Sequence, residues 1–316
     1  MNWKSATATI AAGAAIALTA CGGGDGGPEG SVAIDGSSTV YPITEAVLEE
    51  FSAANRNTRV TAGAKGTGGG FARFCRGETD INDASRPITE GEQELCEENG
   101  VDYVEIPVAY DGVTVAVNSE NDWAQCITVE ELRRIWQPES TIQQWSQVRD
   151  EWPERELVLY GPDTDSGTFD YFTETVVGEE AASRSDYTAS ADDNVLVRGV
   201  RGDVGSLGYF GFAYYIENQD ELRALAVDGG SGCVEPTRET IESGEYAPMA
   251  RPLFIYVKQS ALQRPAVEQF VRYYLDNAPT LVPDVGYVPL SEERYRKIMQ
   301  EHLGSAGAGQ ESAGAS

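Results

Sequence analysis

The sequence predicts an α/β protein of about two domains, and three observations support this prediction. Segments with the composition of strands alternate with segments of helical periodicity along most of the chain. Three of the strands end in a loop rich in glycine and hydroxyl residues that leads into a helix. The chain has 316 residues, 41% of them hydrophobic, which is enough for a sizeable core and for more than one domain. Because helices link the strands, we expect mainly parallel sheets.

Short apolar runs bounded by turn residues predict the strands. They comprise residues 31–34, 59–62, 80–84, 104–109, 113–117, 157–160 and 253–257. Helices are expected where apolar residues recur at helical spacing or follow capping residues. They begin at residues 42, 71, 90, 129, 169, 193 and 267. The helix at 193 is capped by residues 192–194, and the last helix covers residues 267–275. Thr89 and Thr128 each precede a glutamate by three positions, which is a capping box. Residues 110–112 are expected to separate two strands.

The charge balance excludes one class of partner. Lysine and arginine number 23 and aspartate and glutamate 51, so the formal net charge is 23 − 51 = −28. A nucleic-acid-binding protein needs a basic surface, and this composition argues against one. The acidic surface keeps the protein soluble or, alternatively, reflects adaptation to high salt. Capture of an anion by such a chain requires positive potential made locally, by buried arginines or clustered backbone N–H groups.

The N-terminal segment has the pattern of a targeting sequence. Lys4 is followed by an apolar run over residues 10–18, which is too short to span a bilayer. Residues 18–21 (LTAC) resemble a bacterial lipobox, which implies a lipoprotein signal peptide over 1–20 and lipid attachment at Cys21. The alternative is an ordinary signal peptide with an incidental cysteine. Residues 21–30 form a glycine-rich tether, and residues 304–316 are expected to be a disordered tail.

Four cysteines remain once Cys21 is set aside, and an even number outside the cytoplasm indicates two disulfides. Four cysteines allow three connectivities. The sequence has no Cys-x-x-Cys pair, and its single histidine, His302, lies near the C-terminal end. We therefore expect no zinc site.

Three loops carry the same chemistry, each after a strand and at the beginning of a helix. They contain Ser38 and Thr39, Thr67 with two glycines, and Ser166, Gly167 and Thr168. Any one of these loops is adequately explained as a helix N-cap. Three of them could converge at the carboxyl edges of the sheets, where open α/β folds bind ligands. Hydroxyl and backbone N–H groups arriving from several directions suit a tetrahedral oxyanion.

Four motifs, in order along the chain, resemble those of the phosphate-binding proteins of bacterial phosphate ABC transporters. They are residues 36–42 (GSSTVYP), 66–71 (GTGGGF), 84–88 (ASRPI) and 165–169 (DSGTF). The resemblance extends over roughly residues 31–303. It implies a type II periplasmic-binding-protein-like fold with a two-strand hinge and a ligand cleft between two domains. Domain I would comprise residues 31–109 and 250–303, and domain II residues 110–249.

The resemblance also implies the site and the disulfides. Phosphate would be bound by hydroxyl and backbone donors of the three loops. These donors belong to Ser38, Thr39, Thr67, Ser166, Gly167 and Thr168. Cysteines would pair within domains, as Cys75–Cys96 and Cys126–Cys233. In the enteric branch of the family, the position of Arg86 is a carboxylate that accepts the phosphate proton, and an arginine stands where this chain has Pro162. The resemblance therefore predicts Arg86 as the cation here, with a structural ion pair as the alternative.

Selectivity for phosphate over sulfate then needs another acceptor, because sulfate carries no proton to donate. Asp111 and Asp165 are the candidates, and each is equally well explained as a turn or cap residue.

The resemblance implies a monomeric receptor that needs no cofactor and passes phosphate to an ABC permease. Together with the N-terminal segment, it implies an extracytoplasmic protein that is either lipid-anchored to the cell membrane or periplasmic. Alternatives are a receptor for sulfate or arsenate, a phosphate-binding surface protein and, with less support, a phosphatase. Serine hydrolase chemistry needs a histidine base, which His302 is poorly placed to supply. Residues 65–67 (KGT) run in the wrong order for a nucleotide P-loop.

Overall fold

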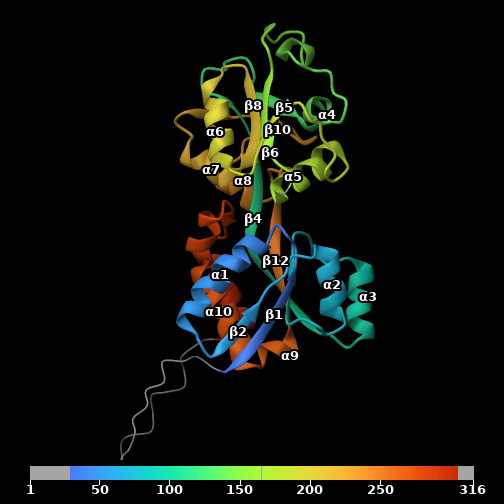
Figure 1. Ribbon diagram of the computed structural model, residues 1–316, viewed down its shortest axis with the longest axis vertical. Helices are drawn as coiled ribbons and strands as arrows, with labels where there is room; N and C mark the ends of the chain where they lie inside the picture. The colour runs from blue at the N-terminus through green and yellow to red at the C-terminus, as the bar shows by residue number, and fades with distance from the viewer. Residues whose placement is uncertain (1–28, 165, 305–316) are drawn as a thin grey trace, which may run out of the picture.

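The computed structural model describes residues 29–164 and 166–304. These residues form two lobes, one above the other in Figure 1, connected by the long strands β4 and β12. We call the lobe that contains the beginning and end of the described chain lobe I (residues 30–102 and 259–302). The other is lobe II (residues 119–249). The predicted lipidation site Cys21 and the signal peptide lie outside the described residues.

Lobe I contains a small sheet covered by helices, with β4 and β12 continuing its plane. Its strands are β1 (Gly30–Gly36), β2 (Thr58–Thr61) and β3 (Ile81–Ala84). Its helices are α1 (Tyr41–Ala54), α2 (Thr67–Cys75), α3 (Glu90–Glu98), α9 (Gln259–Leu262), α10 (Pro265–Asp284) and α11 (Glu292–His302). The short strand β13 (Val288–Pro289) returns to pair with β4. Helix α1 begins with Pro42 in its first turn and buries Ile43, Val47 and Phe51 along one face.

Lobe II is built from shorter elements. Its strands are β5 (Cys126–Thr128), β6 (Val158–Pro162), β7 (Thr188–Ser190), β8 (Ser206–Gly211), β9 (Leu222–Ala224), β10 (Ala226–Asp228) and β11 (Cys233–Val234). Its helices are α4 (Val129–Trp136), α5 (Gly167–Phe172), α6 (Asp193–Gly202), α7 (Phe212–Glu217) and α8 (Arg238–Glu242). A 3₁₀ turn, η1 (Trp145–Gln147), and a π-helical turn, η2 (Thr173–Val177), complete the lobe.

The strands form one large sheet and one small sheet. The large sheet has the order β2-β1-β3-β12-β4-β8-β6-β7, and β9 and β13 also pair with β4. The small sheet has the order β11-β10-β5. Strands linked by helices within a lobe are parallel, as in the pairs β1–β2, β1–β3 and β6–β8. The prediction of mainly parallel sheets is nevertheless wrong, because β4 and β12 are antiparallel to each other and to their outer neighbours.

Strand β4 (Tyr103–Asn118) is continuous, where the sequence predicted two strands separated by residues 110–112. The ladder to β12 (Ala250–Lys258) continues through this segment and places Asp111 directly opposite Arg251. An opposite charge across the ladder makes a buried carboxylate tolerable in the middle of a strand.

Each lobe has its own hydrophobic core, and β4 contributes to both. Ile106 and Val108 lie in the core of lobe I, and Val113 and Val115 lie in the core of lobe II. The strand therefore passes from one core to the other at residues 110–112.

The structure contains the disulfides Cys75–Cys96 and Cys126–Cys233, the two pairs named above. The first joins α2 to α3. No helix among the described residues is long and apolar enough to cross a membrane.

Candidate anion-binding site

A cavity of about 610 Å³ lies between the lobes, beside the hinge strands. Lobe I contributes three loops to it, at residues 37–39, 66–68 and 85–87. Lobe II contributes α5 and the turns after it, and β12 contributes Arg251 and Pro252. The three predicted site residues Ser38, Thr39 and Thr67, together with Arg86, are therefore brought to one cavity.

The loop before α1 is stabilised by hydrogen bonds to Ser37. Ser37 is buried, and its Oγ accepts hydrogen bonds from the backbone N–H groups of Thr39 (3.2 Å) and Val40 (3.4 Å). Its own N–H donates to the carbonyl of Asp83 (2.9 Å) at the end of β3. Ser38 is exposed at the cavity, whereas Thr39 is 5% exposed. The internal hydrogen bonds fix this loop without using either predicted hydroxyl.

The second loop leads into α2. The Oγ1 of Thr67 lies 3.1 Å from the Oγ of Ser85 and accepts a hydrogen bond from the N–H of Ser85 (3.2 Å). Thr67 thereby ties its own loop to the one after β3. Ser85 also lines the cavity. Its hydroxyl is a further possible donor, which was not predicted from the sequence.

The third loop belongs to lobe II and meets the first. Ser166 is the N-cap of α5, and its side chain accepts from the N–H of Thr168 at 3.2 Å. A Cβ placed on Gly167 would come within 2.8 Å of the Oγ1 of Thr39 and 3.2 Å of its Cα. The two lobes therefore touch at Gly167 and Thr39. Asp165, the neighbouring candidate, lies outside the described residues.

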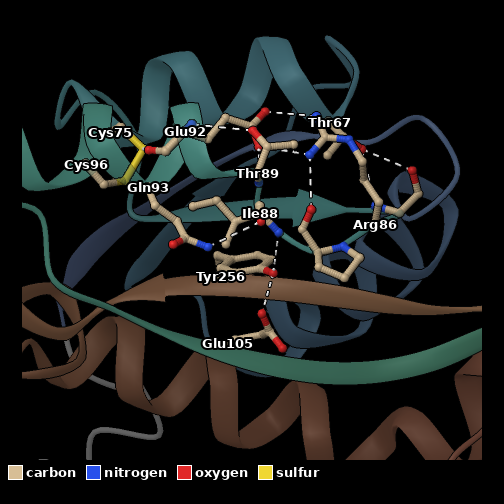
Figure 2. A network of polar contacts seen from close by, with 12 residues as sticks. Thr67, Cys75, Arg86, Ile88, Thr89, Glu92, Gln93, Cys96, Glu105 and Tyr256 are labelled. Atoms are coloured by element: carbon tan, nitrogen blue, oxygen red, sulfur yellow. Dashed lines mark hydrogen bonds and ion pairs between the residues drawn. A yellow bond between two sulfur atoms is a disulfide. The ribbon is translucent and has the colours of Figure 1, made fainter.

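Arg86 lines the cavity but is engaged with a carboxylate. Its Nη1 and Nη2 bind the two oxygens of Glu92 at 2.8 and 2.9 Å, and Nη1 also donates to the carbonyl of Pro87 (3.1 Å). Figure 2 shows the pair beside the N-terminus of α3, where Glu92 also completes the capping box with Thr89. Burial raises the pKa of Glu92, but hydrogen bonds from Arg86 and Thr89 outweigh it, and the pKa lies below its ordinary value. The carboxylate is thus firmly ionised and compensates the charge of Arg86.

Arg251 is the cation that the sequence analysis missed. Its Nε and Nη2 each lie 3.3 Å from Oδ2 of Asp111, and Nη2 also donates to Oγ1 of Thr39 at 3.3 Å. Its guanidinium carbon lies 3.9 Å from the ring centroid of Tyr171, on α5. One side chain of the hinge strand thus contacts both lobes. The only sequence signal was an isolated charge at the beginning of an apolar strand.

Asp111 lies behind Arg251 and is 1% exposed. Burial raises its pKa above the ordinary value, and the charge of Arg251 offsets only part of that effect. It is not among the residues that line the cavity. This position suits a counter-charge for Arg251 better than direct contact with a ligand.

Three carboxylates do line the cavity, all from lobe II: Asp170, Glu174 and Glu180. Burial, followed by the charge of Glu180, raises the pKa of Asp170 above its ordinary value. An anion in this cavity therefore faces cations and hydroxyls from lobe I and the hinge, and carboxylates from lobe II.

The described lining contains no histidine, and His302 lies at the C-terminal end of α11, away from this cavity. Within residues 29–164 and 166–304, no group of three or more His, Cys, Asp or Glu side chains is placed to hold a metal ion.

Comparison with known proteins places the chain in a family. A model described as a PBP superfamily domain matches residues 23–278. The chain is 54% identical over 268 residues to protein SphX of Synechocystis sp., which covers 84% of this chain and 80% of that protein. It is 39% identical over 295 residues to the phosphate-binding protein PstS of Staphylococcus saprophyticus, covering 91% and 90%. The chain belongs to the PBP superfamily and, within it, to the family of SphX and PstS.

Solved structures of the PBP superfamily agree with the fold. A possible phosphate-binding protein from Planctomyces limnophilus superposes with a TM-score of 0.82 at 48% identity, covering 87% of this chain and 98% of that one. PstS from Borrelia burgdorferi gives a TM-score of 0.62 at 26% identity, covering 83% and 99%. These matches confirm the predicted two-domain periplasmic-binding-protein-like α/β fold. The domain boundaries at residues 110 and 250 stay predictions.

Proposed function

We propose that the chain is an extracytoplasmic receptor that binds inorganic phosphate and delivers it to an ABC permease. Relatives from the same family carry the name phosphate-binding protein, and the cavity between the lobes has the donors that a dehydrated tetrahedral anion requires. Binding would proceed by closure of the lobes about β4 and β12, without a chemical step.

One observation carries this proposal: the contact between Gly167 of lobe II and Thr39 of lobe I. It brings the third donor loop against the first, at the edge of the cavity that the second loop also lines. An anion held there would be reached from both lobes, so that its binding free energy would favour the closed state over an open one.

The donors proposed for phosphate are those predicted from the sequence: Ser38, Thr39, Thr67, Ser166, Gly167 and Thr168. Ser166, Gly167 and Thr168 are not among the residues that line the cavity, so the third loop would have to move toward the ligand as the lobes close. The Oγ of Ser166 also accepts from the N–H of Thr168 in the cap of α5 and would have to turn from it to donate. Among acceptors for the phosphate proton, Asp170 joins the earlier candidates Asp111 and Asp165 because it lines the cavity. A carboxylate there would accept from protonated phosphate and repel sulfate.

The wider context is also proposed. Residues 31–109 with 250–303 would move as one domain and residues 110–249 as the other. Lipid attachment at Cys21 would hold the monomeric receptor at the membrane, beside its permease.

Calorimetric titration of the purified protein with phosphate, arsenate and sulfate at several pH values tests the proposal. We expect tight binding of phosphate and weak binding of sulfate. Equal affinity for the two would replace phosphate with oxyanions in general, and no binding of any of them would refute the receptor. Turnover of a chromogenic phosphate ester would favour a phosphatase instead.

A further inference from the structure

We propose that Arg251, rather than Arg86, supplies the positive charge that binds the anion in this cavity. The inference rests on the proposed function, and it names the residue on which affinity depends most. Arg251 lies on the hinge strand β12, where it lines the cavity with 16% of its side chain exposed.

The side chain of Arg251 contacts both lobes. Its Nη2 donates to Thr39 in lobe I, and its guanidinium lies over the ring of Tyr171 in lobe II. The hydroxyl of Tyr171 donates to the carbonyl of Pro248 (2.7 Å), just before β12. The ring is therefore held within lobe II beside the beginning of β12, and its face favours a cation while excluding water from one side of it. A charge held in this way would meet the ligand in the same place whenever the lobes close.

The hydrogen bonds of Arg251 leave one end of the guanidinium uncommitted. Nε donates to Asp111, and Nη2 donates to Asp111 and to Thr39. Among the residues that the structure describes, Nη1 has no hydrogen-bond partner, so two N–H donors remain for oxygens of a ligand. Because the Oγ1 of Thr39 accepts from Nη2, the proton of that hydroxyl is free to be donated to the same ligand.

The two arginines also differ in how fully their charge is compensated. Arg86 and Glu92 form a two-pronged pair at 2.8 and 2.9 Å, the strongest geometry for this ion pair. Arg251 reaches a single oxygen of Asp111, and both contacts are 3.3 Å. An incoming anion would therefore gain more from Arg251, and Asp111 would keep the cation in place while the site is open.

The test compares Arg251→Gln with the matched variant Arg86→Gln, each titrated with inorganic phosphate by calorimetry. We expect Arg251→Gln to weaken binding by about 100-fold, as for loss of a desolvated charge partner. Arg86→Gln should change affinity by less than about 5-fold, as for an exposed ion pair. Arg251→Lys should fall between them, because it keeps the charge but loses the planar fork.

Folding is controlled with the double variant Asp111→Asn/Arg251→Gln, which leaves no unpaired buried charge. It should unfold at a temperature close to that of the unaltered protein and still bind phosphate weakly. If the unaltered protein binds phosphate and Arg251→Gln or the double variant binds it equally well, the inference is overturned while the proposed function stands. If Arg86→Gln shows the larger loss, the roles of the two arginines are reversed. If the unaltered protein binds no phosphate, both the function and the inference fail.

Discussion

Thr39 differs from the other predicted hydroxyl donors in that its side-chain oxygen accepts a hydrogen bond from Arg251. Its side chain is nearly buried where the lobes touch, whereas Ser38 is exposed to solvent. A donor that is already oriented loses little entropy on binding. Thr39 should therefore contribute more to affinity than Ser38, although the sequence presents them as equals.

Replacing Thr39 with valine tests this difference. Thr39→Val keeps the shape of the side chain and removes the hydroxyl, which leaves one ligand oxygen without its donor. We expect phosphate affinity to fall by about 10- to 100-fold in calorimetry. Ser38→Ala is the matched control and should cost less than about 5-fold, because water can replace an exposed donor. Similar losses for both variants would show that burial does not distinguish the two hydroxyls.

A buried carboxyl beneath the same loop predicts how stability depends on pH. Asp83 is fully buried, and burial raises its pKa from 3.8 to about 7, despite a hydrogen bond from Thr44 (2.8 Å). Because the folded state binds this proton more tightly than the unfolded state, the contribution of Asp83 to stability is greatest at low pH and is lost as pH rises toward 7.

Asp83→Asn should remove that dependence. We expect the variant to gain free energy of unfolding relative to the unaltered protein, by roughly 2–3 kcal/mol between about pH 5 and about pH 8. Urea unfolding at both pH values measures it. Asp35 is also buried nearby, where it is paired with Arg73. Its negative charge repels that of Asp83 and adds to the rise in the pKa of Asp83. A difference between variant and unaltered protein that is constant with pH would mean that Asp83 is ionised throughout.

Sequence reasoning assigned the binding charge to Arg86, whereas we propose Arg251. The four motifs include Arg86, so the resemblance assigned it the charge. Arg251 belongs to none of them, and its role depends on a register that places it opposite Asp111, about 140 positions earlier. Pairing across such a separation follows from the sheet and cannot be read from local composition.

At the scale of elements, the first turns of the helices were the most predictable features. Thr89 and Thr128 form the capping boxes that their spacing indicated, and Asp192 caps α6. These signals are local, because each depends on hydrogen bonds within one turn. Helix α10 was underestimated: it extends over Pro265–Asp284 and accommodates two internal prolines, where packing on α1 and β1 outweighs the local preference.

The beginning of α5 offers a prediction about lobe closure. Gly167→Ala would place a methyl group 2.8 Å from Oγ1 and 3.2 Å from Cα of Thr39, so the lobes must separate slightly. We expect phosphate affinity to fall by about 10-fold or more while the melting temperature changes little, because a small misplacement of donors costs binding more than folding.

Gly91→Ala in α3 is the matched control, since a Cβ there would meet nothing within 4 Å. It should leave affinity unchanged. Unaltered affinity in Gly167→Ala would mean that the ligand-bound lobes do not meet at Thr39.

The whole molecule was predictable as an alternation of strands and helices, and the resemblance supplied the two-domain fold. The continuous, antiparallel hinge strands were not predictable. A continuous β4 that enters both cores replaces the expected break at residues 110–112, because the break was inferred from a turn-like Tyr-Asp-Gly composition. The partner strand from far along the chain satisfies that segment, and tertiary pairing overrides the local signal.

The net charge of −28 leads to a last prediction, on the rate of anion capture. Long-range repulsion by the protein, reinforced at the mouth by Glu174 and Glu180, opposes an approaching anion, whereas Arg251 acts only at short range. Salt screens the long-range part first. We expect the association rate for phosphate to rise by about 2- to 10-fold between about 10 mM and about 150 mM NaCl, opposite to ordinary steering of a ligand to a site of opposite charge. Stopped-flow fluorescence of a labelled cleft measures it, and Glu174→Gln/Glu180→Gln should flatten the dependence. A rate that falls with salt would mean that the arginines govern the field outside the cavity as well as within it.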